Sequence, residues 1–170
     1  MDHIEALTKS QLEYMLKSDS KTEIFTLNSR NILAKIVSVH DGDSCKANIY
    51  VGDVLSQFSL RLMGYDSPEI RTKNASEKEC ANISKACLQS LLLDKVVRLE
   101  CLDFDKYGRV LANVYVRLKV LSGEGGCKEL NVNNFMVKHR LGHPYFGDKK
   151  NSFDELFDKK YYTLGEKLNF

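Results

Sequence analysis

Short runs rich in apolar residues predict β-strands along much of the chain. They cover residues 32–39, 45–51, 56–63, 96–101 and 110–118, and in the third run Phe58, Leu60 and Leu62 alternate with polar residues at a two-residue period. Between the third and fourth runs, apolar side chains such as Ile83 and Leu91 recur at helical spacing, which predicts a helix over residues 76–93. Five strands that are interrupted and followed by helices favour an α+β fold, built as a small β-barrel with helical cover.

The last third of the chain is predicted to contain two helices that follow a glycine-rich connection. A glycine-rich loop is expected at 121–127, and helices are expected at 131–139 and 153–164. The body of the domain therefore covers residues 31–170.

Residues 1–30 form an extension ahead of the first strand. Ser10 and Glu13 have the spacing of a capping box, and Leu12, Met15 and Leu16 follow at helical spacing, so part of this extension is predicted to be a short amphipathic helix. Such a helix would either pack on the barrel or serve as an arm for a partner.

Length and composition limit the class of protein. The 170 residues suit one domain, and no apolar run is long enough to cross a membrane, so no membrane association is expected. The formal net charge of +2 is too small to indicate nucleic-acid binding, so any attraction to phosphate must be local. The first 20 residues lack the apolar centre of a secretory signal, which favours an intracellular, cytoplasmic protein over a secreted one. A monomer is expected.

The five cysteines agree with a reducing compartment. Their number is odd and none has Cys-x-x-Cys spacing, which argues against a disulfide framework. Cys87 and Cys101 lie in apolar surroundings and are expected to be small core residues.

Acidic residues gather where two strands end. Asp43 follows an Asp-Gly turn, and Asp66 follows the third strand just before Ser67-Pro68. Carboxylates are hard oxygen ligands that suit Ca²⁺ or Mg²⁺. Glu69 follows closely enough to orient or deprotonate a water molecule without binding the metal.

Two other metal sites are disfavoured by the residues present. An EF-hand is excluded because Lys46 stands where the loop needs glycine and Gly52 where it needs glutamate. His139 and His143 have helical ligand spacing, but Gly142 and Pro144 disfavour a helix, so both are expected at the surface or in a substrate cleft.

Two arginines also stand at strand ends. Arg61 alternates with the apolar Leu60 and Leu62, so it points away from the core, and Arg109 begins the fifth strand after a Tyr-Gly turn. A guanidinium keeps its charge and can form two parallel hydrogen bonds to a phosphate. Acids that hold a cation together with such arginines are what phosphodiester hydrolysis requires.

At this point the chain resembles the staphylococcal nuclease-like (thermonuclease) family. The resemblance extends from about Asn31 to the C-terminus and rests on three signatures in order: Asp-Gly-Asp at 41–43, Arg61 with Asp-Ser-Pro-Glu at 66–69, and Asp-Lys-Tyr-Gly-Arg at 105–109. It implies a five-stranded OB-type β-barrel with three helices, preceded here by the short extension.

The resemblance also implies roles for individual residues. By their positions in the motifs, Ca²⁺ would be held by Asp43, Asp66 and the carbonyl of Ser67; Arg61 and Arg109 would be catalytic with Glu69; and substrate would be contacted by Lys106, Tyr107 and the base-stacking Tyr145.

The implied activity is a calcium-dependent nuclease of low sequence specificity that acts on DNA, RNA or both and leaves 3′-phosphate ends. A reducing cytosol holds little free Ca²⁺, so Mg²⁺ or Mn²⁺ stays open as the physiological ion. Two alternatives also stay open: a catalytically weak relative that binds nucleic acid or protein, and a calcium-binding structural domain. The second alternative leaves the two arginines without a purpose at the site.

Overall fold

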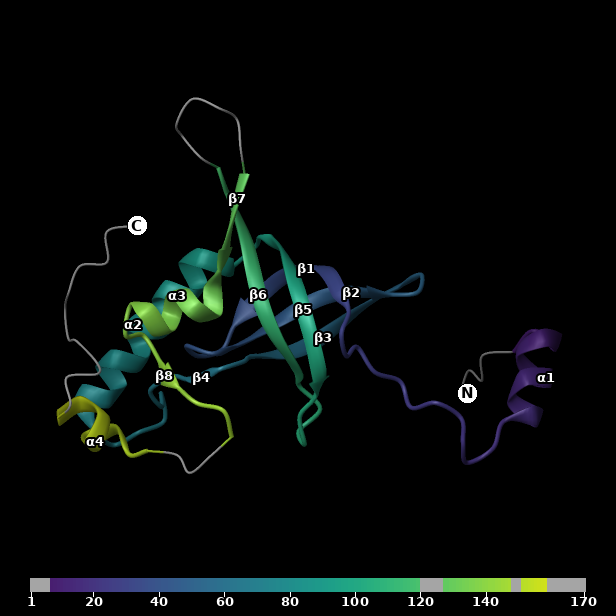
Figure 1. Cartoon of the computed structure of the whole chain (residues 1–170), viewed down its shortest axis with the longest axis horizontal. Helices are drawn as coiled ribbons and strands as arrows, with labels where there is room; N and C mark the ends of the chain where they lie inside the picture. The colour runs from purple at the N-terminus through teal and green to yellow at the C-terminus, as the bar shows by residue number, and fades with distance from the viewer. Residues whose placement is uncertain (1–6, 120–126, 148–150, 159–170) are drawn as a thin grey trace, which may run out of the picture.

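The computed structural model describes residues 7–119, 127–147 and 151–158 (Figure 1). Its helices are α1 (Lys9–Lys17), α2 (Ala75–Leu92), α3 (Val132–Lys138) and α4 (Phe153–Asp158). Its strands are β1 (Asn31–Val39), β2 (Ser44–Val51), β3 (Val54–Leu62), β4 (Tyr65–Asp66), β5 (Val96–Phe104), β6 (Val110–Lys119), β7 (Cys127–Asn131) and β8 (His143–Pro144).

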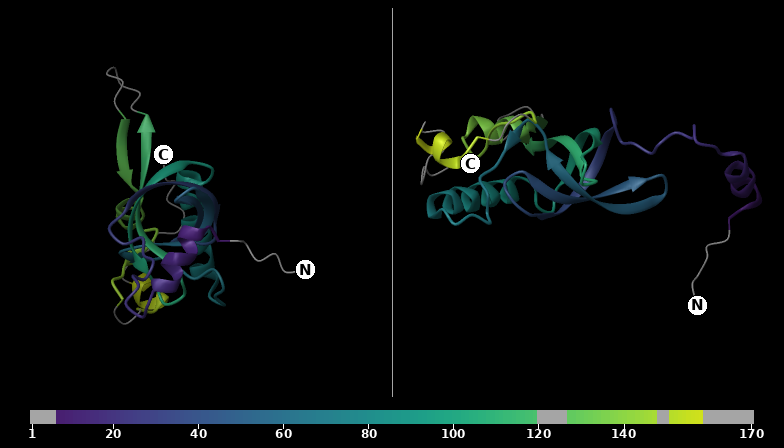
Figure 2. Two further views of the ribbon diagram at one scale, coloured as in Figure 1. Left: turned by 90° about the vertical axis from the view of Figure 1, so that its right-hand side faces the viewer. Right: turned by 90° about the horizontal axis from the view of Figure 1, so that it is seen from below.

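Five strands close into a barrel. The sheet runs in the order β3-β2-β1-β5-β6-β7, and all of these neighbours are antiparallel. A parallel pairing of Leu60–Leu62 with Val110–Ala112 joins β3 to β6 and closes the ring, which is seen end-on in Figure 2 (left). The predicted α+β fold with a five-stranded OB-type barrel is confirmed, as are three helices in the body of the domain and one in the extension.

The core follows from the alternation in the sequence. Ile36, Ile49, Leu60, Leu62 and Leu99 are all fully buried, while their neighbours along the strands face outward. A register shift in β1 between Ile36 and Ser38 marks a bulge, which bends the strand so that it can pair with β2 and β5 within one small ring.

Helices cover one side of the barrel (Figure 1). α2 begins at the N-cap Asn74, whose side chain accepts a hydrogen bond from Glu77 N–H. Its buried stripe includes Ala81, Ser84 and Leu88, which are three and four residues apart, and this face lies against β1. α3 lies against β6, with Met136 fully buried.

Several elements differ from the predictions. β7 was not predicted: only its first residue, Cys127, was expected in the loop, and only its last, Asn131, in the helix. Asn131 is the N-cap of α3, so this helix begins one residue late. The two-residue strands β4 and β8 were not predicted, because a pair this short has no periodicity in the sequence. The helix expected over 153–164 is described as α4 only to residue 158, and the rest lies outside the described residues.

The N-terminal helix is present but begins earlier than predicted. The cap is formed by Thr8 and Gln11 in place of Ser10 and Glu13, since both pairs fit the capping-box pattern and the earlier one adds two helical residues. α1 buries no residue and lies away from the barrel, so the expectation that it packs on the domain is wrong (Figures 1 and 2). Core packing begins at Leu27, which is buried.

Cys45, Cys80, Cys87 and Cys101 are free thiols and buried, and the predicted core positions of Cys87 and Cys101 are confirmed. Among the described residues, no helix combines the length and apolarity needed to cross a bilayer.

Close packing makes Gly142 a sensitive position. A β-carbon there would overlap the ring of the fully buried Tyr65 and approach the carbonyl of Asp66. We expect Gly142→Ala to lower the free energy of unfolding by about 1–3 kcal/mol, because the core has no room for one more carbon. Urea unfolding measures this change.

The matched control is Ala86→Ser, which also adds one heavy atom but on the exposed side of α2. It should change the free energy of unfolding by less than about 0.5 kcal/mol. Equal effects of the two substitutions would contradict the packing at Gly142.

Candidate active site

Strand pairing brings the charged motifs to one end of the barrel. Ser44 pairs with Arg61, so the turn before β2 lies beside the end of β3. Arg61 also pairs with Leu111, so the turn before β6, which carries Arg109, lies on its other side. Residues separated by up to 68 positions in the chain therefore share one edge of the barrel.

The Asp-Gly-Asp turn is held by its own side chains. Asp41 Oδ1 accepts hydrogen bonds from Asp43 N–H at 3.1 Å and from Ser44 Oγ at 2.7 Å. A β-carbon on Gly42 would overlap Ser84 Oγ on α2, so only glycine allows the turn to lie this close to the helix. The result is that the carboxylate of Asp43 is fixed and only 6% exposed.

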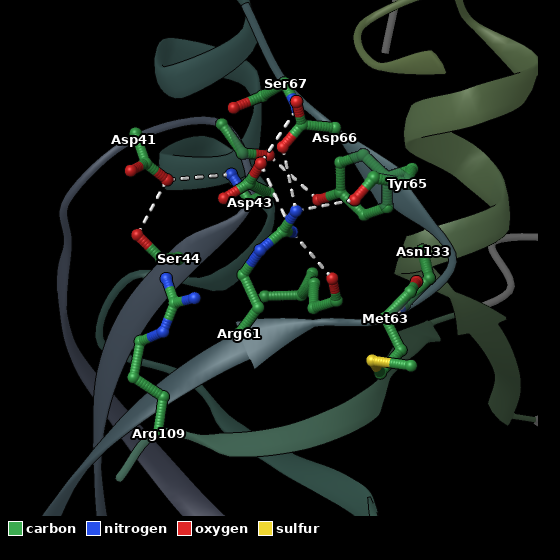
Figure 3. Close-up of polar contacts among 12 residues, drawn as sticks. Asp41, Asp43, Ser44, Arg61, Met63, Tyr65, Asp66, Ser67, Arg109 and Asn133 are labelled. Carbon is green, nitrogen blue, oxygen red and sulfur yellow. Dashed lines mark hydrogen bonds and ion pairs between the residues drawn. The ribbon is translucent and has the colours of Figure 1, made fainter. Parts of the chain in front are cut away.

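Arg61 links the two predicted metal-binding acids (Figure 3). Its Nη1 lies 3.2 Å from Asp43 Oδ2, and its Nη2 lies 3.0 Å from Asp66 Oδ1. The same two nitrogens donate to the carbonyls of Leu62 at 2.8 Å and Tyr65 at 2.9 Å. The two carboxylates thus converge on one guanidinium, whose terminal nitrogens each have two protein acceptors.

Arg109 is held differently. Its Nε donates to Asp105 Oδ2 at 2.7 Å, while Asp105 Oδ1 accepts the backbone N–H groups of Tyr107 and Arg109. Among the described residues, no acceptor lies within hydrogen-bond distance of its two terminal nitrogens. Arg109 therefore presents a free, oriented fork toward the cleft.

One cleft of about 410 Å³ contains every residue nominated from the sequence. It is lined by Asp43, Arg61, Asp66, Ser67, Glu69, Lys106, Tyr107, Arg109 and Tyr145, together with Asp41, Pro68 and Ile70. The nine residues therefore lie together around one cleft, while their individual roles stay predictions.

Three of these residues have contacts that bear on their predicted roles. Ser67 N–H donates to Asp43 Oδ2 at 2.8 Å, which places its backbone at the acids. Tyr145 N–H donates to Gly64 O at 3.1 Å, which fixes the aromatic residue after β8 beside the cleft. Glu69 is exposed, and its Oε1 accepts Arg71 N–H at 3.0 Å.

Comparison with known proteins agrees with this geometry. The family model described as staphylococcal nuclease homologue matches residues 59–163, which is more than half of the chain. The chain belongs to the staphylococcal nuclease family.

Individual relatives are more distant. An uncharacterized endonuclease of Escherichia coli is 31% identical over 108 residues, which cover 64% of this chain and 58% of the relative. The probable endonuclease lcl3 of Emericella nidulans is 29% identical over 136 residues, covering 68% of this chain and 48% of the relative. The chain thus spans about half the length of the curated relatives it matches.

The family's metal position can be tested against the donor set present here. Among the described residues, no group of three or more His, Cys, Asp or Glu side chains is arranged to hold a metal ion. The metal position implied by the family needs only two acidic side chains, because its third protein ligand is a backbone carbonyl; all three are hard oxygen donors. Asp43 and Asp66 are both nearly buried and already converge on one cation, Arg61, so the residues present fit a divalent ion.

Burial and hydrogen bonds determine the pKa values of the two acids in the Asp-Gly-Asp turn. Burial raises the pKa of Asp43 to about 7, although the Arg61 charge opposes the rise. Burial also acts on Asp41, but hydrogen bonds from Ser44 and Asp43 outweigh it and lower the pKa of Asp41. Two acids separated by one glycine are thus expected to titrate far apart.

The residues that orient the site were not predicted from the sequence, and the location predicted for one histidine is wrong. Asp41 and Asp105 were inside the quoted motifs but received no role, although their side chains orient Asp43 and Arg109. Tyr65 Oη donates to Gly42 O at 2.8 Å across the core, a contact without any local signal. His143 is 4% exposed and pairs with Asp66 in β4–β8, so the expectation of a surface or cleft residue is wrong.

The raised pKa of Asp43 predicts a pH-dependent stability. Folded protein keeps the proton up to about pH 7, whereas the unfolded chain releases it near pH 3.8, so the folded state binds more protons in this interval. The contribution of Asp43 to the free energy of unfolding should therefore fall as the pH rises from about 4 to about 7. Asp43→Asn, compared with wild type by urea unfolding in chelator, should gain relative stability over that range.

Asp41→Asn provides the control of opposite sign. Because the pKa of Asp41 is lowered, wild type should be more stable than this variant at neutral pH, and the difference should disappear as the pH falls below 3.8. Parallel pH profiles of wild type and both variants would contradict the assigned environments.

Proposed function

We propose that this chain is a divalent-cation-dependent nuclease that hydrolyses phosphodiester bonds of DNA, RNA or both with low sequence specificity. The observation that carries the proposal is the single cleft in which two buried carboxylates, two guanidinium groups and one exposed carboxylate converge. Family membership and the endonuclease names of the relatives support the same reaction class.

The phosphate would be bound first by Arg109. Asp105 fixes Nε of this side chain, so the two terminal nitrogens are oriented together toward the cleft. A preorganised guanidinium stabilises the negative charge that builds on phosphorus in the transition state, and one such donor is worth about 3 kcal/mol. Arg61 is the second cation, but its terminal nitrogens also contact Asp43 and Asp66, so its charge is shared with the acids.

Glu69 is the proposed general base. It is the exposed carboxylate of the cleft, it lies three residues after Asp66, and no arginine or lysine lies within ion-pair distance among the described residues. Its only described acceptor contact is with the nearby Arg71 N–H, which a side-chain rotation can release. Glu69 would then orient or deprotonate the attacking water.

Asp43, Asp66 and the carbonyl of Ser67 would hold the cation, with Ca²⁺ as the family's ion and Mg²⁺ or Mn²⁺ as alternatives. When bound, such an ion polarises a phosphate oxygen and neutralises charge on the diester. Burial is the main cause of the raised pKa of Asp43; the charges of Asp41 and Asp66 add to the rise, and the Arg61 charge does not cancel it.

The substrate contacts and products follow the family expectation. Lys106 and Tyr107 line the mouth of the cleft and are proposed to contact a neighbouring phosphate, while Tyr145 stacks a base. Cleavage is proposed to leave 3′-phosphate ends. Stacking and phosphate contacts read no base edges, which agrees with low sequence specificity.

Replacing Glu69 tests the catalytic role. Glu69→Gln should lower kcat by about 100-fold or more, because the amide cannot accept the water's proton. The urea midpoint and the affinity for a single-stranded oligonucleotide should stay unchanged. Glu79→Gln, an equal change at an exposed position of α2, should leave all three quantities unchanged.

The outcome separates the competing functions. If cleavage persists in Glu69→Gln, another group is the base. If wild type binds oligonucleotide but cleaves none, the chain is the binding module kept as the alternative. If it binds a cation but no nucleic acid, it is the structural domain.

Removal of the cation tests the metal assignment. A chelator should abolish cleavage of single- and double-stranded DNA and RNA, and adding Ca²⁺, Mg²⁺ or Mn²⁺ separately should identify the ion that restores it. If the phosphate stays on the 3′ side, the new 3′ ends should accept label only after phosphatase treatment, whereas the new 5′-hydroxyl ends should be labelled by a polynucleotide kinase without it. Full activity in chelator would contradict the role of Asp43 and Asp66.

A further inference from the structure

A chain of three cavities extends the active-site cleft along the barrel. The second cavity, of about 370 Å³, shares Arg61, Arg109 and Tyr145 with the cleft. The third, of about 420 Å³, shares Met63, Gly64 and Phe146 with the second. The shared residues show that the three cavities lie in a row. We call this row the groove and its third cavity, which lies beyond Phe146, the side groove.

The side groove has a floor that is already fixed. Asn133 is 4% exposed, and its amide nitrogen donates to the carbonyls of Met63 and Ala112, while its oxygen accepts Val114 N–H. These contacts tie α3 to β6 and to the end of β3. Figure 3 shows Met63 and Asn133 on the side of Arg61 that faces away from Asp41.

The walls of the side groove combine one aromatic face with neutral and basic polar groups. Phe146 is 77% exposed, so its ring is available to stack on a base. Lys138 and Asn134 are exposed on α3 at the same cavity, and none of the described residues lining it is acidic. The acidic residues of the active-site cleft, in contrast, lie at the other end of the groove.

We propose that the side groove is a further nucleotide-binding site, which takes an unpaired nucleotide of the same strand beyond the two that flank the scissile phosphate. This inference rests on the proposed nuclease function. Phe146 stacks the base, and Lys138 and Asn134 contact the sugar–phosphate chain. Only an unpaired base offers a free face to Phe146, so the groove selects single-stranded nucleic acid.

The order of the three neighbouring cavities identifies the occupant. A strand whose phosphate lies between Arg61 and Arg109 passes Tyr145 and Phe146 in the second cavity and then enters the third. Lys138 supplies a positive charge at the far end, where the next phosphate arrives. A neutral apolar ligand would have no use for this charge.

Asn134→Glu tests the side groove without threatening the fold. Position 134 is the third residue of α3 after the N-cap Asn131, where a glutamate favours the helix, so the variant adds negative charge at the groove at no cost in stability. Affinity for a fluorescent single-stranded oligonucleotide of about eight nucleotides, measured by anisotropy in chelator, should fall about five- to tenfold. Lys138→Gln should lower it in the same direction.

Two controls separate an effect at the side groove from a general effect of charge or an effect on catalysis. Lys35→Glu, a larger charge change on the exposed face of β1, should leave the affinity within about twofold of wild type. With the activating cation present, Asn134→Glu should cleave a dinucleotide at the wild-type rate, because a dinucleotide does not reach the side groove.

Two outcomes would overturn the side groove: an unchanged affinity in Asn134→Glu, or an equal loss for the dinucleotide and the longer strand. A duplex bound as tightly as the single strand, with the same loss in Asn134→Glu, would overturn the selection of unpaired bases. Failure of the proposed function gives a different pattern: wild type cleaves nothing, while Asn134→Glu still weakens binding.

Discussion

The arrangement of this end of the barrel depends on the contact of Arg61 with two nearly buried carboxylates. Asp43 and Asp66 lie on different segments and are both nearly buried. Without a cation between them their negative charges would repel each other, because little solvent is present to screen them. Arg61 compensates both while its terminal nitrogens also donate to Leu62 O and Tyr65 O. Because only the turn at residues 63–64 separates the end of β3 from β4, this contact also fixes the turn that leads to Ser67 and Glu69 at the cleft. Loss of the guanidinium would leave buried charge without compensation, so structure and proposed chemistry depend on the same side chain.

An element of the fold could be predicted from the sequence when a local pattern of residues stabilises it, and not when contacts between distant segments do. The five barrel strands and α2 have apolar residues that repeat over many positions, as in Leu60 and Leu62 or Ala81, Ser84 and Leu88, so periodicity finds them. β4 and β8 are two residues long and exist because Asp66 meets His143 in space, which no local pattern encodes. The start of α1 was ambiguous for a different reason. Two cap patterns, at Thr8 and Ser10, overlap in the sequence, and only the hydrogen bonds decide between them.

The same distinction applies to the candidate site. The nine nominated residues converge because they stand at strand ends and turns, and barrel closure brings those ends together. The residues that hold them were harder to predict. Asp105 acts through Arg109 at a spacing of four residues within a turn, and Tyr65 reaches Gly42 from the opposite side of the core. A motif marks which residues are chemically useful, but it does not mark which neighbours fix their direction, because those contacts depend on packing between segments distant in sequence.

The two arginines are therefore not equivalent in this cleft. Arg61 is 11% exposed at its side chain and shares its charge with two acids, whereas Arg109 is 34% exposed and has both terminal nitrogens free among the described contacts. In the proposed reaction, a phosphate that enters from solvent would meet the Arg109 fork first, since the Arg61 charge is already largely compensated by Asp43 and Asp66. A divalent ion at these acids would take over that compensation and leave the Arg61 charge available to the phosphate. The cation requirement of such a site would then arise from electrostatic competition for two carboxylates as much as from polarisation of the substrate.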